Sequence, residues 1–294
     1  MKLRLLKYIK SPLGVFHRLK RDIPYWIRGT TFYANAKKYR QDTSIKHTSP
    51  KYEINQYIDY RTTRKANGVI YTCITNDYDD LSLIANPPYI NPDWDYICYT
   101  DNSEDCEIGQ IGIWEIRPLY NKKFDATRQN RWHKLHPHIL FPEYNESIYI
   151  DANILILSSF LFDELKTKNS NIVIPLHPQR SCIYDEYSNI FAEFMDNPTL
   201  IYEELKLVKR SGMPKNFGLT ENNLIYRRHH NHEIIELMSE WWFIVTHFAK
   251  RDQLSLCWLL WQHDIKISDI SIPHAITASG RYTVLPHKKR IRLH

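Results

Sequence analysis

The sequence predicts an α/β layered fold with a mainly parallel central sheet, and two observations support this. Short runs rich in isoleucine, valine and aromatic residues alternate with longer segments whose apolar residues recur at helical spacing. Such alternation is typical of buried parallel strands covered by helices. Polar clusters directly follow several of the runs, where sheets of this class bind ligands.

Composition limits the class of protein. With 294 residues, 43% of them apolar, the chain can bury a large core as one domain, or as one domain with an appendage. The five cysteines form no CxxC pair, which favours buried thiols in a reducing compartment. No apolar run reaches the roughly 18 to 20 residues of a membrane span, and charges stand where a secretory signal would be apolar. We therefore expect a cytoplasmic protein.

A basic amphipathic helical leader and a linker are expected at residues 1–56, ahead of a larger domain at 57–294. Residues 1–40 contain eleven Lys or Arg and one acid, a balance of +10, so the net charge of +6 leaves about −4 for the remainder. Two interpretations stay open for the leader: it lies on the anionic inner face of a membrane, or it packs on the domain with a solvated face. No nucleic-acid module is recognised, and we expect no nucleic-acid partner.

Five strands are expected, at residues 68–75, 94–100, 112–119, 147–155 and 171–177. Helices are expected at 125–140, 158–166 and 182–196. The polar residues that follow the first, second and fourth strands should meet at one edge of the sheet; these candidates for donor binding are Thr75, Asn76, Asp77, Asp101 and Asp151.

Asp151 and Asn153 interrupt an otherwise apolar run. A carboxylate there must be solvated, paired or bound to a metal, because an isolated buried charge is costly. The alternative is a strand end that has reached the surface and turns, which Asp and Asn also favour.

The sequence contains neither a Rossmann nor a P-loop glycine pattern, so side chains must hold any phosphates. Arg128, Arg131 and Lys134 are spaced by three and should lie near one helix face, where they would suit a diphosphate. An ordinary solvated helix face is the alternative.

Several ordered blocks carry a family resemblance, among them VIYTCITNDYDDL, DWDYICYTDN, ESIYIDANI, HPQRSCIYDE, GLTENNLIYRRHH and KRDQLSLCWLLW. From about residue 68 to about residue 262 the chain resembles the bacterial branch of the glycosyltransferase-like family of plant mucilage and turgor-regulation proteins, formerly a domain of unknown function. The resemblance implies a GT-A fold and a nucleoside diphosphate sugar donor.

The resemblance also implies a D-x-D-like motif that meets the diphosphate through a divalent cation, Mn²⁺ or Mg²⁺. Asp151 stands at its first acid, but Asn153 replaces the second, so the cation site would have less charge. His287 is the expected third ligand, with His274 as the competitor.

Two carboxylates are the catalytic candidates. In similar enzymes an Asp-Gln at a helix start lies beside the donor sugar, which assigns Asp252 and Gln253 to that place; a helix N-cap is the alternative for Asp252. Glu186 is the candidate general base. The alternative is that Glu186 is an acid in the first turn of a helix, where it interacts favourably with the helix dipole. The acceptor candidates are His177, Arg180, Tyr184, Glu221 and Asn223.

Together these features predict a glycosyltransferase that moves a sugar, from a UDP-linked donor, to a growing surface glycan or a lipid-linked glycan. Two alternatives remain: a nucleotide-sugar or glycan-binding module without turnover, and a membrane-associated structural protein that uses the basic leader.

Overall fold

The computed structural model describes residues 54–61, 65–193, 195–274 and 280–288. The chain divides into two units, residues 1–47 and 48–294, and every described residue belongs to the second. The predicted leader at residues 1–40 therefore lies outside the described residues. The predicted domain start at residue 57 falls inside helix α3, Ile54–Arg61.

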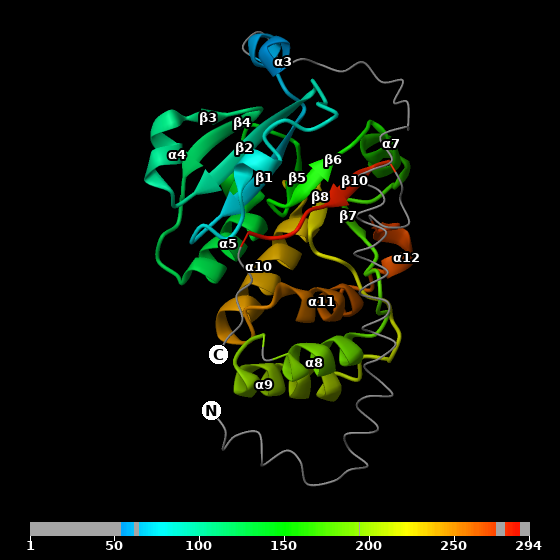
Figure 1. The fold of residues 1–294 in the computed structure, drawn as a ribbon. Coiled ribbons are helices and arrows are strands. Elements are labelled where there is room, and N and C mark those ends of the chain that lie inside the picture. The colour runs from blue at the N-terminus through cyan, green and yellow to red at the C-terminus, as the bar shows by residue number, and fades with distance from the viewer. Residues whose placement is uncertain (1–53, 62–64, 194, 275–279, 289–294) are drawn as a thin grey trace. The chain divides into compact units, whose positions relative to one another are not determined.

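A mainly parallel sheet forms the centre of the second unit (Figure 1). Its strands lie in the order β3-β4-β2-β1-β5-β8-β7-β9, and among these described strands β3 and β8 run antiparallel to their neighbours. The predicted α/β fold with a mainly parallel central sheet is confirmed. The strand bounds are β1 Gly68–Ile74, β2 Trp94–Thr100, β3 Gln110–Ile111, β4 Trp114–Pro118, β5 Glu146–Ile150, β7 Ile172–Pro175, β8 Leu224–Arg227 and β9 Ser271–Ile272.

Strand β1 shows why apolar runs, rather than alternating ones, form this sheet. All seven of its residues are buried. Val69 and Tyr71 belong to one hydrophobic core, and Ile70 and Ile74 belong to the other. Because successive side chains point to opposite faces, a strand covered on both sides must be apolar throughout.

The strand predicted at 147–155 is two strands, and the prediction of one continuous strand was wrong. β5 ends at Ile150, and β6, Ile154–Ile156, pairs instead with β10, Tyr282–Val284, in a separate two-stranded sheet. The amide of Ile154 donates to the carbonyl of Asp151 at 2.9 Å, which closes a turn between the two strands. The turn interpretation of Asp151 and Asn153 is therefore right about the backbone.

Helices cover both faces of the sheet. One core gathers side chains from α5, α8, α9, α10, α11 and α12, and the other gathers them from α3, α7 and η1. The bounds of the elements not yet given are η1 Leu81–Leu83, α4 Ser103–Ile108, α5 Ala126–Leu135, α6 Pro137–Leu140, α7 Phe160–Thr167, α8 Ile183–Ala192, α9 Pro198–Arg210, α10 His232–His247, η2 Asp252–Leu254, α11 Leu256–Gln262 and α12 Ile267–Ile270.

The helix predicted at 125–140 is also divided. Asp125 caps the start of α5 by accepting from the amide of Arg128, and α5 ends at Leu135. Pro137 has no amide hydrogen to continue the ladder, so a new short helix, α6, begins there. In the part of the chain that the structure describes, no helix combines the length and apolar character needed to cross a membrane.

Candidate functional site

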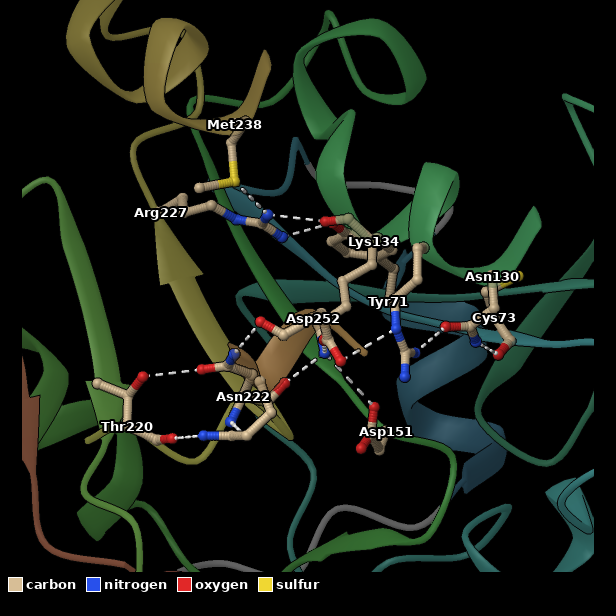
Figure 2. A network of polar contacts seen from close by, with 12 residues as sticks. Tyr71, Cys73, Asn130, Lys134, Asp151, Thr220, Asn222, Arg227, Met238 and Asp252 are labelled. Atoms are coloured by element: carbon tan, nitrogen blue, oxygen red, sulfur yellow. Dashed lines mark hydrogen bonds and ion pairs between the residues drawn. The ribbon is translucent and has the colours of Figure 1, made fainter. Parts of the chain in front are cut away.

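Four charged side chains meet near the carboxyl end of β5, as Figure 2 shows for three of them. The ammonium of Lys134 lies 2.5 Å from one carboxylate oxygen of Asp252 and 4.0 Å from Asp151. The guanidinium Nε of Arg131 lies 3.1 Å from the other oxygen of Asp252. When all four groups are ionised, the two cations and two carboxylates sum to zero.

Asp252 is an ionised carboxylate held by two cations. Burial alone would raise the pKa of Asp252, but Arg131 and Lys134 outweigh it and lower the pKa to about 2. Asp252 is the first residue of η2, and no side chain caps that helix, so the N-cap interpretation was wrong. A carboxylate with so low a pKa stays ionised near pH 7 and is a poor proton acceptor.

Lys134 is part of the protein's interior rather than of an open phosphate site. Its side chain is 1% exposed, and burial lowers the pKa of its ammonium despite the opposing effect of Asp252 and Asp151. The ammonium also donates to the carbonyl of Asn222 at 2.5 Å. Arg131 and Lys134 do lie together, as their spacing predicts, but both already have carboxylate partners.

Arg128 is placed elsewhere, and the expectation that it joins the other two cations is corrected. It donates to the carbonyls of Val245 and Phe248 at the end of α10, and its Nη1 lies 2.9 Å from Asp125. A cation suits the last carbonyls of a helix, which have no intrahelical partner. Arg128 therefore joins α5 to α10.

Asn222 connects the charged cluster to the Asp252–Gln253 turn, with each of its polar groups engaged. Its side-chain amide donates to the carbonyl of Asp252 at 3.2 Å, and its side-chain oxygen accepts from Thr220 at 2.8 Å (Figure 2). Its backbone amide lies 3.4 Å from Oε1 of Gln253, whose Nε2 in turn donates to the carbonyl of Thr220. These contacts fix η2 against the start of β8.

Glu221 and Asn223 lie toward Asp151 instead. The carbonyl of Asn223 accepts from the amide of Asp151 at 2.8 Å. Burial and the nearby charge of Asp151 raise the pKa of Glu221 to about 7, although a hydrogen bond from Asn223 opposes them. Oδ1 of Asn223 is buried and finds no hydrogen-bond partner among the described residues, so a polar group of the site is left to be satisfied by something else.

A second buried amide oxygen without a described partner belongs to Asn153. Its Nδ2 donates to the carbonyl of Leu285 at 2.7 Å and lies 3.5 Å from Nε2 of His287. Nδ1 of His287 contacts Asp79 at 2.8 Å, the kind of carboxylate contact that orients a metal-binding imidazole. The C-terminal segment thus comes to the turn after β5, as Figure 1 shows for β10 and β6.

These residues fit a divalent cation in part. Among the described residues, no three histidine, cysteine or carboxylate side chains form a group that could hold a metal ion. The set Asp151, Asn153 and His287 includes an amide, and its carboxylate, amide oxygen and imidazole suit a cation that takes its other ligands from phosphate and water. His274 lies near enough to His177 to lower the pKa of that imidazole.

The polar residues after β1 hold the loop rather than stand free. Thr75 donates to the carbonyl of Ala126 at 2.9 Å, and Asp101 accepts from the amide of Asn76 at 2.8 Å. Asn76 and Asp77 both have positive φ, 55° and 50°, a backbone conformation that is uncommon outside glycine. Asp77 accepts from Lys288 at 2.6 Å, a second link between this loop and the C-terminal segment.

The expected acceptor cluster divides into two groups. His177, Arg180 and Glu186 lie together: Arg180 donates to Glu186 and is 3.3 Å from Nε2 of His177. Burial and Arg180 lower the pKa of His177 to about 3, so it is neutral near pH 7. Tyr184 points away and donates to the carbonyl of Met213. Glu186 is buried and forms an ion pair with Arg180.

The sequence indicates Asn222, together with Glu221 and Asn223, as a residue that could hydrogen-bond sugar hydroxyls, but it does not indicate two other buried partners of this site, Asp79 and Arg227. Asp79 stands in the same polar run as Asp77, so a signal existed for it. Arg227 is part of the apolar strand β8, and nothing in the local sequence indicates that its guanidinium contacts the end of α5.

Comparison with family models matches residues 46–271 to the TOD1/MUCI70 glycosyltransferase-like domain. Comparison with curated proteins gave no match. Solved structures to which the chain is similar include three glycosyltransferases. The bifunctional glycosyltransferase WbbM in its apo form shares 11% identity over 77% of this chain and 40% of that chain, with a TM-score of 0.45. Mouse xyloside xylosyltransferase 1 in its apo form shares 12% sequence identity over 72% of this chain and 85% of that chain, with a TM-score of 0.39. Galactosyltransferase LgtC, in complex with donor and acceptor sugar analogues, shares 9% sequence identity over 66% of this chain and 69% of that chain, with a TM-score of 0.40.

The chain spans less than half the length of the WbbM chain that it matches. The family match, in contrast, covers more than half of this chain and includes β1, the turn after β5, the start of β8 and η2. The protein is a member of the TOD1/MUCI70 glycosyltransferase-like family.

Proposed function

We propose that this glycosyltransferase moves a sugar from a nucleoside diphosphate donor, a UDP-sugar, to a growing cell-surface glycan of capsule, O-antigen or lipopolysaccharide type. The observation that carries the proposal is the buried cluster of Arg131, Lys134, Asp151 and Asp252 at the carboxyl end of β5. Open α/β sheets bind ligands at this edge. The unpartnered amide oxygens of Asn153 and Asn223 supply further polar groups there.

The charge balance of the cluster favours a divalent cation. A diphosphate adds negative charge, while Arg131 and Lys134 are already paired with Asp252, and Arg128 is bound to α10. The donor therefore needs another source of positive charge. In our proposal Asp151, Asn153 and His287 hold Mn²⁺ in preference to Mg²⁺, because the set includes an imidazole and Mg²⁺ takes oxygen ligands. The cation would offset charge that develops on the leaving diphosphate.

The protein's own residues orient the donor and stabilise the reacting sugar. Asp151 is 30% exposed at its side chain and is the accessible carboxylate of the cluster, whereas Asp252 is 9% exposed. Asp252 stays ionised because of its low pKa, so in this proposal it stabilises positive charge at the anomeric carbon without accepting a proton. Gln253, on the same turn, is proposed to contact the donor sugar.

Glu221 and Asn223 are proposed to contact the acceptor. Both lie on the side of the β8 start that faces Asp151, and Oδ1 of Asn223 has no partner among the described residues. His177, Arg180 and Glu186 form a neighbouring polar cluster, connected through the hydrogen bond from the amide of His177 to the carbonyl of Leu219. We propose that Glu186 positions Arg180 in this cluster instead of acting as the general base.

A thermal-shift panel of UDP-, GDP-, CMP- and dTDP-sugars, each with and without Mn²⁺, tests the proposal. A ligand that binds the native state raises the melting temperature, and we expect the largest rise with a UDP-sugar and Mn²⁺ together. The sugar that gives this rise is then incubated with the protein, and release of UDP is measured. Binding without any release of UDP would indicate a binding module without turnover. No shift with any donor would contradict the proposed function.

The basic leader is proposed to hold the enzyme at an anionic membrane surface, near a lipid-linked acceptor. Its charge of +10 over residues 1–40 supports this, since each cation near such a surface contributes about 1 kcal/mol.

A further inference from the structure

Arg227 is a fully buried arginine without a carboxylate partner among the described residues. Its side chain is 0% exposed, and its Nε has no hydrogen-bond partner in the part of the chain that the structure describes. Burial lowers the pKa of its guanidinium, and the groups that oppose this effect are two phenols, Tyr71 and Tyr149. A cation buried without an opposite charge beside it is costly, because its lost hydration is not compensated.

The guanidinium contacts the end of α5 at one residue. Nη1 of Arg227 donates to the backbone carbonyl of Lys134 at 2.7 Å, and Nη2 donates to the hydroxyl of Tyr71 at 2.5 Å (Figure 2). The hydroxyl of Tyr71 donates to the same carbonyl at 2.8 Å. Met238 on α10 completes the surroundings, with its sulfur 3.3 Å from Nη1.

The carbonyl of Lys134 needs partners from outside the helix. It is one of the last four carbonyls of α5, which have no intrahelical donor, and Pro137 shortly afterwards prevents the helix from continuing. Arg227 and Tyr71 supply two donors, and a positive charge at this end of a helix is favourable. The backbone of Lys134 is thereby held at its carbonyl by Arg227 and Tyr71. The ammonium at the other end of the residue contacts Asn222, Asp252 and Asp151.

We propose that Arg227, together with Tyr71, is a positioning residue for the transfer reaction: it holds the backbone of Lys134 so that the Lys134 ammonium stays on Asp252. The kinetic consequence of this inference rests on the proposed function of the Asp252 site. Its structural consequence, the place of the Lys134 ammonium, can be measured without a substrate.

Arg227→Met tests the proposal, with Arg228→Met as the matched control. Arg228 is the next residue, 51% exposed at its side chain, with a 3.7 Å ion pair to Glu146. The first measurement is the ¹⁵N resonance of the Lys134 ammonium, assigned by its loss in Lys134→Met. We expect the resonance to shift or broaden in Arg227→Met and in Tyr71→Phe, and to stay unchanged in Arg228→Met. An unchanged resonance in Arg227→Met would overturn the proposal.

The second measurement is turnover of a UDP-sugar with Mn²⁺, followed by release of UDP. In Arg227→Met we expect kcat to fall at least about tenfold while the KM for the donor changes less than about twofold, because a misplaced catalytic geometry lowers the rate more than binding. Arg227→Lys, which keeps the charge and one donor, should recover part of the loss. Equal kcat in Arg227→Met and the parent protein would also overturn the proposal.

The two measurements separate this inference from the proposed function. If the parent protein neither binds nor turns over any donor, the proposed function fails, while the ammonium resonance still decides the role of Arg227. If the Arg227→Met protein is partly unfolded, Tyr71→Phe gives the same test, because it removes the hydroxyl shared by Arg227 and Lys134 and keeps the ring. A resonance unchanged in folded Tyr71→Phe would count against the proposal.

Discussion

The ammonium of Lys134 lies 2.5 Å from a carboxylate oxygen of Asp252, and both side chains are buried between α5 and η2. The two residues are 118 positions apart in the chain. This ion pair connects the helix that carries the predicted diphosphate cations to the turn that carries the predicted catalytic acid. Because each residue is the ion-pair partner of the other, the role that the sequence predicts for each depends on the other.

Removing both members should therefore cost less than the sum of the two single removals. Lys134→Met and Asp252→Asn should each destabilise the protein by about 3–5 kcal/mol, because each leaves a buried charge with less compensation. The double variant should cost less than the sum, by about 0.5–3 kcal/mol. Urea unfolding of the four proteins measures this coupling. Turnover should fall at least about a hundredfold in Asp252→Asn and should not return in the double variant.

The exposed pair Glu203 and Lys206 on α9 is the control for this cycle, at 2.8 Å. Glu203→Gln with Lys206→Met should show a coupling of about 0.3–0.5 kcal/mol, as exposed pairs one helical turn apart do. Equal coupling in the two cycles would mean that burial does not strengthen the Lys134–Asp252 pair.

Arg128 should matter for stability rather than for donor binding. Arg128→Gln removes the donors to Val245 and Phe248 at the end of α10. We expect it to lower the free energy of unfolding by about 1–2 kcal/mol and to leave the KM for the donor unchanged. Arg131→Gln, which removes a cation from Asp252, should lower turnover. A raised donor KM in Arg128→Gln would restore the diphosphate role expected from the sequence.

The cation site should respond to charge at position 153. Asn153→Asp adds a carboxylate beside Asp151 and should tighten Mn²⁺ binding by about an order of magnitude, since affinity rises with ligand charge. Asp79→Asn weakens the contact that orients His287 and should lower Mn²⁺ affinity by about 10- to 100-fold. Titration with Mn²⁺ in the presence of UDP, followed by electron paramagnetic resonance, measures both.

Asp80→Asn is the control for the cation site. Asp80 caps η1 through Ser82, and Asn keeps a capping oxygen, so Mn²⁺ affinity should not change. Equal Mn²⁺ affinity in the parent protein, Asn153→Asp, Asp79→Asn and Asp80→Asn would contradict the proposed cation site. Full turnover in excess EDTA would also contradict it.

Glu204 should make the protein less stable as the pH rises. It is buried on α9, where it accepts from Tyr187 and from the amide of Ala249, ahead of the Asp252 turn. Burial raises its pKa from 4.5 to about 8. Because the folded pKa lies above the unfolded value, the stability from its protonated form is complete below about pH 4.5 and is lost as the pH rises through about 8.

Glu204→Gln imitates the protonated acid and should remove this dependence, which is on the order of a few kcal/mol. Urea unfolding of both proteins at several pH values between 4.5 and 8 gives the difference. The pKa of Glu221 is also raised, to about 7, but Glu221 is present in both proteins, so its contribution cancels. Parallel curves for the two proteins would mean that Glu204 is ionised in the folded state.

The leader should determine membrane binding. The full chain should cosediment with vesicles that contain phosphatidylglycerol, and binding should weaken with salt, because the screening length is about 8 Å at physiological ionic strength. A protein without residues 1–40 should not cosediment, yet should keep its turnover of the donor. Neutral phosphatidylcholine vesicles are the control. A deletion that lowers the melting temperature or gives insoluble protein, with no vesicle binding by the full chain, would favour helices packed on the domain.

The sequence by itself determined the fold class and most of the elements that position the site. Apolar runs such as 68–75 and 94–100 are typical of strands buried on both faces, because they are short and rich in isoleucine, valine and aromatic residues. The confirmed strands β1 and β2 follow from this. Family motifs in the same blocks indicated the glycosyltransferase-like family to which the chain belongs, a conclusion that composition and periodicity alone did not support.

Only the tertiary structure decided which charges are available. Arg128, Arg131 and Lys134 look equivalent in sequence because they share a helix face, but one binds the end of α10 and two neutralise Asp252. Those partners lie more than 100 residues away along the chain. The energy of a buried charge depends on what surrounds it in space, and helical spacing carries no information about the groups that pack against the helix.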